Sequence, residues 1–252
     1  MRSRPLPKIG ITSSDAYEHD GSLHHELVPY VRSVVRAGGE PVLLVNDEAN
    51  VDELLGVLDG VLLTGGVDVD PARYGGKPEH SHSQANKYRA DRDGFEISLV
   101  RTLREVGVPA LCICRGIQIA SVALGGTLVE DVRDELGVRY AINHRQTYEN
   151  GQDRSDYAPG HEVTVDPQSK LAQLAGATSF PTNSMHHQAL RTVGAGLKAV
   201  AHTSDGIVEA FETEADQMFF FGVQWHPEEL ATDPISERLF AGLIRNASER
   251  RR

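Results

Sequence analysis

The stretch "LCICRGIQIA", residues 111–120, contains both cysteines of the 252-residue chain, Cys112 and Cys114, two positions apart. Such a pair could form a redox couple, half of a metal site, part of the core, or a nucleophile. Cys-x-Cys is a poor dithiol motif, and no second Cys/His cluster follows at zinc-site spacing. Cys112 lies within an apolar run and is predicted to be buried. Cys114 lies where a strand is expected to end and a helix to begin, which leaves core and nucleophile open for it.

The segment "GVQWHPEE" near the end of the chain offers partners for a cysteine nucleophile. His226 follows an apolar strand pattern, and Glu228 lies two positions further on. A thiol nucleophile needs a base, and the base needs a group that orients it. Together with Cys114, these two residues predict a Cys-His-Glu triad for acyl transfer.

An acyl-transfer site also needs donors for the oxyanion of its tetrahedral intermediate. The run "GVLLTGG" ends in paired glycines, and the backbone N–H of Gly66 is a candidate donor. The N–H of Arg115, at the start of the helix after Cys114, is the other candidate, and the same helix N-terminus would stabilise a thiolate. Whether Gly65 or Gly66 serves is left open by the sequence.

Two patterns of elements would position these residues. The first half alternates short apolar runs ("KIGIT", "PVLLV", "GVLLTGG", "VPALCI") with helical periodicity over 22–37, 51–58, 91–106 and 117–124. This alternation predicts an α/β fold with a mostly parallel central sheet flanked by helices. The second half reads as closely spaced, additional antiparallel strands ("HEVTV", "LKAVAHT", "GIVEAFE", "FFFGVQW"), with helices near "SMHHQAL" and over 234–246. We expect one domain over residues 1–252, an exposed loop over 75–87, and a flexible basic tail over 246–252.

Composition excludes several classes of function. The chain has 25 basic and 36 acidic side chains, a formal charge of −11, which argues against nucleic acid or an anionic membrane as partner. No apolar run approaches the roughly 20 residues of a membrane span, and the first residues do not form a secretion signal. Two cysteines make no disulfide framework, so we expect a reducing, cytoplasmic location. The oligomeric state stays open, with a homo-oligomer as one alternative.

Several stretches, in order, resemble a known family: "LTGGVDVDPARYG", "RDGFEISLVRTL", "ICRGIQIASVALGGTL", "NHRQ", "NSMHHQAL", "DGIVEA" and "GVQWHPE". The chain resembles the class I glutamine amidotransferase superfamily and within it is most similar to the gamma-glutamyl-gamma-aminobutyrate hydrolases. The resemblance implies a flavodoxin-like three-layer fold, the triad Cys114, His226 and Glu228, and no cofactor. One departure is Cys112, which stands where the superfamily commonly has glycine.

Further residues are candidates for substrate contacts. The stretch "NSMHHQ" places His187 and Gln188 near the substrate cleft by resemblance, and His144, Arg145 and His161 have a similar status. Residues in or after the predicted loop could hold a substrate carboxylate, for which a guanidinium group is well suited. A solvated position on the surface is an equal alternative for each of them. These candidates are Arg73 and Arg89, with Tyr74 and Arg92 beside them.

No metal is expected. The adjacent His186 and His187 diverge on a helix or a strand, so they make no ready bidentate site. Asp68 and Asp70 are assigned to a turn beside the glycines. The remaining histidine pairs are expected at the surface: His24 with His25, and His80 with His82.

The expected reaction is hydrolysis of a gamma-glutamyl amide through a cysteine thioester. By resemblance, the substrate is a small gamma-glutamyl amine such as gamma-glutamyl-4-aminobutyrate, as in putrescine breakdown. One alternative is a glutamine amidotransferase subunit that supplies ammonia to a partner synthetase. Another is a non-catalytic or redox-regulatory protein on the same fold.

Overall fold

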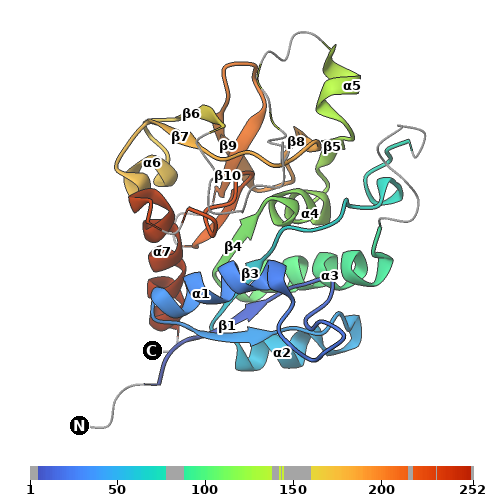
Figure 1. Cartoon of the computed structure of the whole chain (residues 1–252), viewed down its shortest axis with the longest axis vertical. Helices are drawn as coiled ribbons and strands as arrows, with labels where there is room; N and C mark the ends of the chain where they lie inside the picture. The colour runs from blue at the N-terminus through green and yellow to red at the C-terminus, as the bar shows by residue number, and fades with distance from the viewer. Residues whose placement is uncertain are drawn as a thin grey trace.

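The computed structural model describes residues 5–77, 88–137, 142, 144, 160–214, 218–230 and 232–250. Within this part, one sheet has the strand order β2-β1-β3-β4-β11-β10-β9-β6-β7 (Figure 1). Its first five strands are mutually parallel: β1 (Lys8–Ile11), β2 (Glu40–Leu43), β3 (Gly60–Leu63), β4 (Ala110–Ile113) and β11 (Phe220–Val223). The predicted α/β fold with a parallel central sheet is therefore confirmed.

The second half of the chain extends this sheet with antiparallel strands, as predicted, except that the strand of "FFFGVQW" is β11, which pairs parallel with β4. The antiparallel strands are β6 (His161–Val165), β7 (Ser179–Thr182), β9 (Leu197–His202) and β10 (Val208–Thr213), with β8 (Ala189–Thr192) pairing β10 and β5 (Thr127–Val129). The helix predicted at "SMHHQAL" is wrong, because residues 184–188 are irregular and Ala189 opens β8. Leu190 pairs with Leu128 and with Val208, and these long-range strand pairings override the local pattern.

Helices cover both faces of the sheet and make three layers (Figure 1). One face packs against α1 (Val28–Arg36), α6 (Lys170–Ala175) and α7 (Pro234–Arg250), and the other against α2 (Val51–Val57), α3 (Ala90–Val106) and α4 (Arg115–Ala123). Shorter pieces are α5 (Val132–Leu136), η1 (His25–Leu27), η2 (Glu48–Asn50) and η3 (Pro71–Arg73). Side chains of a strand alternate between faces, so Leu111 enters one core and its neighbour Cys112 the other.

The C-terminal segment corrects the predicted flexible tail over 246–252. Helix α7 continues through Arg250, and Ala247 is fully buried one turn beyond Leu243. The Arg250 guanidinium donates a hydrogen bond to the Leu58 carbonyl at 3.1 Å. The apolar face of the helix therefore continues into the basic segment whose composition had suggested a flexible tail. Residues 251–252 lie outside the described part.

The loop predicted over 75–87 falls mostly on residues 78–87, which lie outside the described part, as do His80 and His82. Residues 75–77 form neither helix nor strand. Among the helices that are described, none has both the length and the apolar character needed to cross a bilayer.

A buried group of four charged side chains joins α3 to α4. The Arg115 guanidinium is 1% exposed and contacts the carboxylates of Asp93 and Glu96, and Arg92 Nε donates to Glu96 Oε1 at 2.9 Å. Burial alone would raise the pKa of Glu96, but the guanidinium groups of Arg115 and Arg92 hold it below its usual value. The carboxylate therefore stays ionised, and two positive charges face two negative charges inside the protein.

We expect Arg115→Met to lower the free energy of unfolding by about 3–5 kcal/mol, because removing one partner leaves buried carboxylates uncompensated. The matched control is Arg89→Met, which breaks ion pairs with Asp15 and Asp91 at the surface and should cost at most about 1 kcal/mol. Urea denaturation followed by circular dichroism measures both. Equal losses in the two variants would contradict the role assigned to the buried group.

Candidate active site

Cys114 lies at a sharp turn between β4 and α4. Its φ and ψ are 53° and −107°, and no other non-glycine residue in the described part has a positive φ. Such backbone conformations cost about 1–3 kcal/mol and persist only when the surroundings impose them. The Cys114 N–H donates to the Val223 carbonyl at 2.9 Å, so sheet pairing continues up to the turn. Gly116 lets α4 approach β3, since a Cβ there would lie 2.5 Å from the Leu63 carbonyl oxygen.

The two cysteines occupy different environments. Cys112 is fully buried in the core beneath α3 and α4, whereas Cys114 belongs to the opposite core cluster and borders a cavity. Burial raises the pKa of the Cys112 thiol, so this side chain stays protonated and unreactive. Both thiols are unpaired, and the geometry gives no support to a redox couple.

His226 and Glu228 lie together beyond the end of β11. His226 Nδ1 is 2.5 Å from Glu228 Oε1, and the Asn183 amide clamps the His226 backbone through bonds of 2.8 and 2.9 Å. A Cβ placed on Gly65 would lie 3.0 Å from His226 Cε1 and 3.6 Å from Cys114 Cβ, so imidazole and thiol flank the same glycine. The structure thus brings the three predicted triad residues to one place.

Electrostatics favours a charged imidazole at this site. Burial opposes protonation of His226, but the adjacent negative charges of Cys114 and Glu228 raise its pKa well above the usual value. An imidazolium beside Cys114 and Glu228 is the proton donor that acyl transfer by a cysteine requires.

Tyr30, on α1, is a site residue that the sequence analysis missed. Its hydroxyl is 3.4 Å from His226 Nδ1 and accepts a hydrogen bond from the Gly65 N–H at 3.0 Å. Burial, and then the charges of Glu228 and Cys114, raise the pKa of Tyr30, so the phenol stays neutral. Within "VPYVRS" it looks like an ordinary aromatic residue on the buried face of a helix, and no local signal marks it.

The Gly65 N–H already donates to the Tyr30 hydroxyl, so Gly66 is the better candidate for the oxyanion donor. Gly66 has φ of +142°, and a Cβ there would lie 2.4 Å from Arg92 Nη1. The Arg115 N–H lies in the first turn of α4, where backbone N–H groups have no partner within the helix. The roles of Gly66 and Arg115 remain predictions.

A cavity of about 580 Å³ opens at this end of the sheet, a size suited to a small molecule. Most of the residues that line it have polar or charged side chains. Its lining comprises Ser13, Ser14, Asp15, His24, His25, Glu26, Leu27, Tyr30, Thr64, Gly65, Gly66, Val67, Arg92, Cys114, Met185, His226, Glu228 and Glu229.

Two of the predicted arginine contacts, Arg73 and Arg89, do not line this cavity. Arg73 donates to a main-chain carbonyl at the start of α3, at 3.3 Å, and Arg89 pairs with Asp15 and Asp91. Arg92 does border the cavity, but its guanidinium is buried and bound to Glu96 and Ser14. A substrate contact by Arg73 or Arg89 stays a prediction.

The predicted contacts from "NSMHHQ" also lie outside the lining. His187 is held between Asp68, at 2.9 Å from its Nε2, and Asp131, at 3.3 Å from its Nδ1. Burial disfavours its charged form, but the two carboxylates raise the pKa of His187. Gln188 is buried, and its carbonyl accepts from His186.

A separate interior group could hold a metal ion: His144, His161, His186 and Glu209. His186 takes part without its neighbour His187, so the divergence of adjacent side chains does not exclude a site. One sequence signal was available. In "HEVTV" the strand alternation puts His161 on the buried side with Val163 and Val165. Arg145 lies outside the described part.

Known proteins resemble this chain over most of its length. A Mycobacterium tuberculosis protein described as "putative glutamine amidotransferase" is 38% identical over 222 residues, covering 87% of this chain and 66% of that protein. Protein NtpR of Enterococcus hirae is 32% identical, covering 88% of this chain and 91% of NtpR. The gamma-glutamyl-gamma-aminobutyrate hydrolase PuuD of Escherichia coli K12 is 32% identical, covering 85% and 83%.

A solved structure has the same fold. It is a Thermoplasma acidophilum protein described as one component of a "putative GMP synthase", with a TM-score of 0.66 and 16% identity over 98% of this chain and 97% of the other. Residues 7–228 match the family described as Peptidase C26. The predicted resemblance to class I glutamine amidotransferases is thus confirmed, and the chain belongs to the Peptidase C26 family.

Proposed function

We propose that this protein hydrolyses the gamma-glutamyl amide bond of small gamma-glutamyl amines through a cysteine thioester. The observation that carries the proposal is the position of His226, bonded to Glu228 and beside Cys114 on the wall of one cavity. A nucleophile, a base and an orienting carboxylate in this order form the arrangement used for acyl transfer.

In the first half of the proposed reaction, the Cys114 thiolate attacks the gamma-carbonyl carbon of the substrate. The oxyanion that forms accepts hydrogen bonds from the N–H groups of Gly66 and Arg115. As the intermediate collapses, the carbon–nitrogen bond breaks and the His226 imidazolium gives its proton to the departing amine. The glutamyl group remains as a thioester on Cys114.

In the second half, neutral His226 takes a proton from water, and the resulting hydroxide attacks the thioester carbon. The carbon–sulfur bond breaks, glutamate leaves, and the thiolate and imidazolium are restored. Glu228 stabilises the imidazolium in both halves and holds its tautomer. The Tyr30 hydroxyl lies 3.4 Å from His226 Nδ1, the same ring atom that Glu228 contacts, and accepts a hydrogen bond from the Gly65 N–H.

The leaving group is proposed to be an amine such as 4-aminobutyrate. Support comes from PuuD and from a second gamma-glutamyl-gamma-aminobutyrate hydrolase, of Escherichia coli O157:H7, which is 33% identical. A cavity of about 580 Å³ has room for a leaving group larger than ammonia. Two unpaired cysteines fit the reducing, cytoplasmic location expected for such an enzyme.

The competing activity is release of ammonia from glutamine for a partner synthetase. The Mycobacterium tuberculosis relative carries an amidotransferase description, and the same triad would serve both reactions. The two differ in leaving group and in dependence on a partner, so substrate preference separates them.

Replacing the two cysteines should give opposite results. Cys114→Ala should reduce turnover to background with an unchanged fold, because the nucleophile is lost. Cys112→Ala should keep most of kcat and lose about 1 kcal/mol of stability, as a small core truncation does. Glutamate release and thermal unfolding measure the two effects. A folded but inactive Cys112→Ala would show that the wrong cysteine was chosen.

Replacing His226 should lower the activity more than replacing Glu228. His226→Asn should lower kcat by about 10⁶-fold, since it removes the proton carrier, and Glu228→Gln by about 10²–10⁴-fold, since it removes an orienting charge. Glu229→Gln is the matched control and should stay near wild type. The assignment fails if Glu229→Gln loses activity while Glu228→Gln keeps it.

Steady-state kcat/KM decides the substrate class. The purified protein, with no partner added, should cleave gamma-glutamyl-4-aminobutyrate faster than glutamine, because contacts to the larger leaving group can be used in the chemical step. Free glutamate is measured for both substrates and for a panel of gamma-glutamyl amines. Preference for glutamine, or activity only with a synthetase, would favour the amidotransferase.

A further inference from the structure

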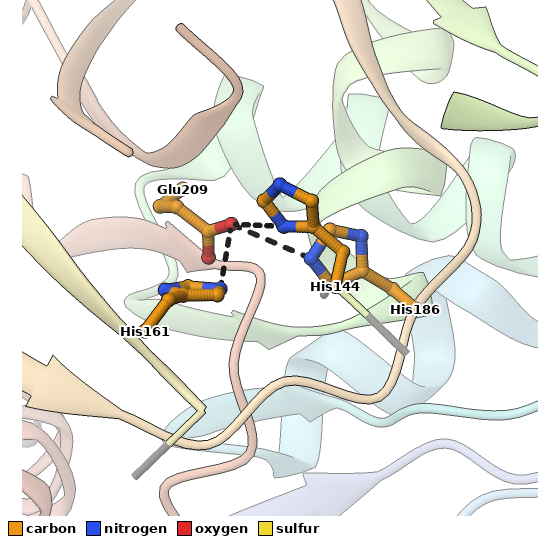
Figure 2. Close-up of side chains that lie close together, drawn as sticks. All are labelled: His144, His161, His186 and Glu209. Carbon is orange, nitrogen blue, oxygen red and sulfur yellow. Dashed lines mark ion pairs between the residues drawn. The ribbon is translucent and has the colours of Figure 1, made fainter. Parts of the chain in front are cut away.

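Four side chains from distant parts of the chain converge in the interior of the antiparallel half of the molecule (Figure 2). His161 opens β6, Glu209 lies on β10, His186 lies between β7 and β8, and His144 comes from the segment before β6. Each residue is at most 8% exposed, and none borders the cavity of Cys114. The group is therefore a second cluster of polar side chains, separate from the candidate triad.

The atoms that face one another lack hydrogen-bond partners within the described part. They are His144 Nδ1, His161 Nε2, His186 Nε2 and both carboxylate oxygens of Glu209. Leaving a buried polar atom without a hydrogen-bond partner is unfavourable, because the atom has lost its water and gained nothing in return. One ligand atom from each residue lies within 4.8 Å of the others, so a single occupant could satisfy all four residues.

The distances match metal ligands better than hydrogen bonds. Glu209 Oε1 is 3.6 Å from His144 Nδ1, 3.4 Å from His161 Nε2 and 3.4 Å from His186 Nε2 (Figure 2). A charge-assisted hydrogen bond would be about 2.7–2.9 Å long. Ligands around a tetrahedral zinc ion, at bonds of about 2.0–2.1 Å, lie about 3.3–3.4 Å apart.

Outer contacts orient two of the rings. His144 Nε2 is 2.9 Å from Asp205 Oδ2, and His186 Nδ1 is 2.8 Å from the Gln188 carbonyl oxygen. A metal-binding histidine commonly donates its other N–H to a carboxylate or a carbonyl, which leaves a lone pair for the metal. Both rings have this arrangement, and the free nitrogen of each points into the cluster (Figure 2).

The buried carboxylates near the cluster also favour a bound cation. The carboxylates of Glu209 and Asp205 are 0% and 4% exposed, and both lie beside histidine rings of the cluster. A divalent cation would neutralise them.

We propose that His144, His161, His186 and Glu209 bind one zinc ion in a closed, structural site. Three nitrogens and one oxygen suit zinc, and four protein ligands leave no open position for substrate. This inference goes beyond the proposed function and does not depend on it.

The position of the site suggests what the ion does. The His144 carbonyl accepts from Ser184 Oγ and from the His186 N–H, at 2.6 and 2.9 Å. Asn183, next in the chain, clamps the backbone of His226. The ion would therefore fix the segment on which the candidate catalytic histidine rests.

Metal analysis of protein purified without a histidine tag tests the proposal. We expect about one zinc per chain, and an occupancy lowered about tenfold or more in His161→Ala and Glu209→Ala. Two controls should keep their zinc. His25→Ala removes a ligand from the exposed group Glu18, His24 and His25, and Cys114→Ser removes the reactive thiol.

If a ligand variant does not fold, the same proposal can be tested on the wild-type protein by removing and restoring the metal. Chelation should lower the Tm, and zinc chloride alone should restore it. Cobalt added to the stripped protein should give the intense visible bands of tetrahedral coordination with no thiolate charge-transfer band. The proposal is wrong if the protein contains no metal and its Tm does not change when zinc is added. Loss of zinc in His25→Ala or Cys114→Ser, or another ion in the four-residue site, would also overturn it.

Discussion

The backbone of Cys114 is the constraint on which the rest of this structure depends. A side chain other than glycine holds a positive φ there, and only its surroundings can maintain that conformation. Pairing with β11 carries the sheet up to this residue, and Gly116 lets α4 pack against the end of β3. The buried carboxylates of α3 bind Arg115, the first residue of α4, and so fix the other side of the turn.

The same turn explains why two cysteines two positions apart differ so much in chemistry. Cys112 is still part of the strand, and its thiol is enclosed by apolar side chains. Cys114 has left the strand and meets His226, whose pKa is raised by the negative charges on either side of it. The reactivity proposed for Cys114 follows from the direction of its side chain and from neighbouring charge, since the residue type is identical.

The antiparallel half of the sheet supports the candidate catalytic histidine. Asn183, just after β7, binds the His226 backbone at two points, and the Gln224 N–H donates to the Glu209 carbonyl at 2.8 Å. Glu209 is also the carboxylate of the proposed zinc site. The extra strands therefore connect the candidate triad to the histidine cluster through the backbone on either side of His226.

The sequence by itself determined the elements whose signal is local. Apolar runs and helical periodicity predicted the parallel strands and most of the helices, and strand ends marked Cys114, Gly66 and His226. Features set by distant partners were decided only in the tertiary structure. The segment "SMHHQAL" pairs with other strands, and the end of α7 packs into the core. Tyr30 had no local signature, and the histidine cluster had only the alternation that places His161 on the buried side of its strand, because side chains up to 196 positions apart meet only when the sheet is assembled.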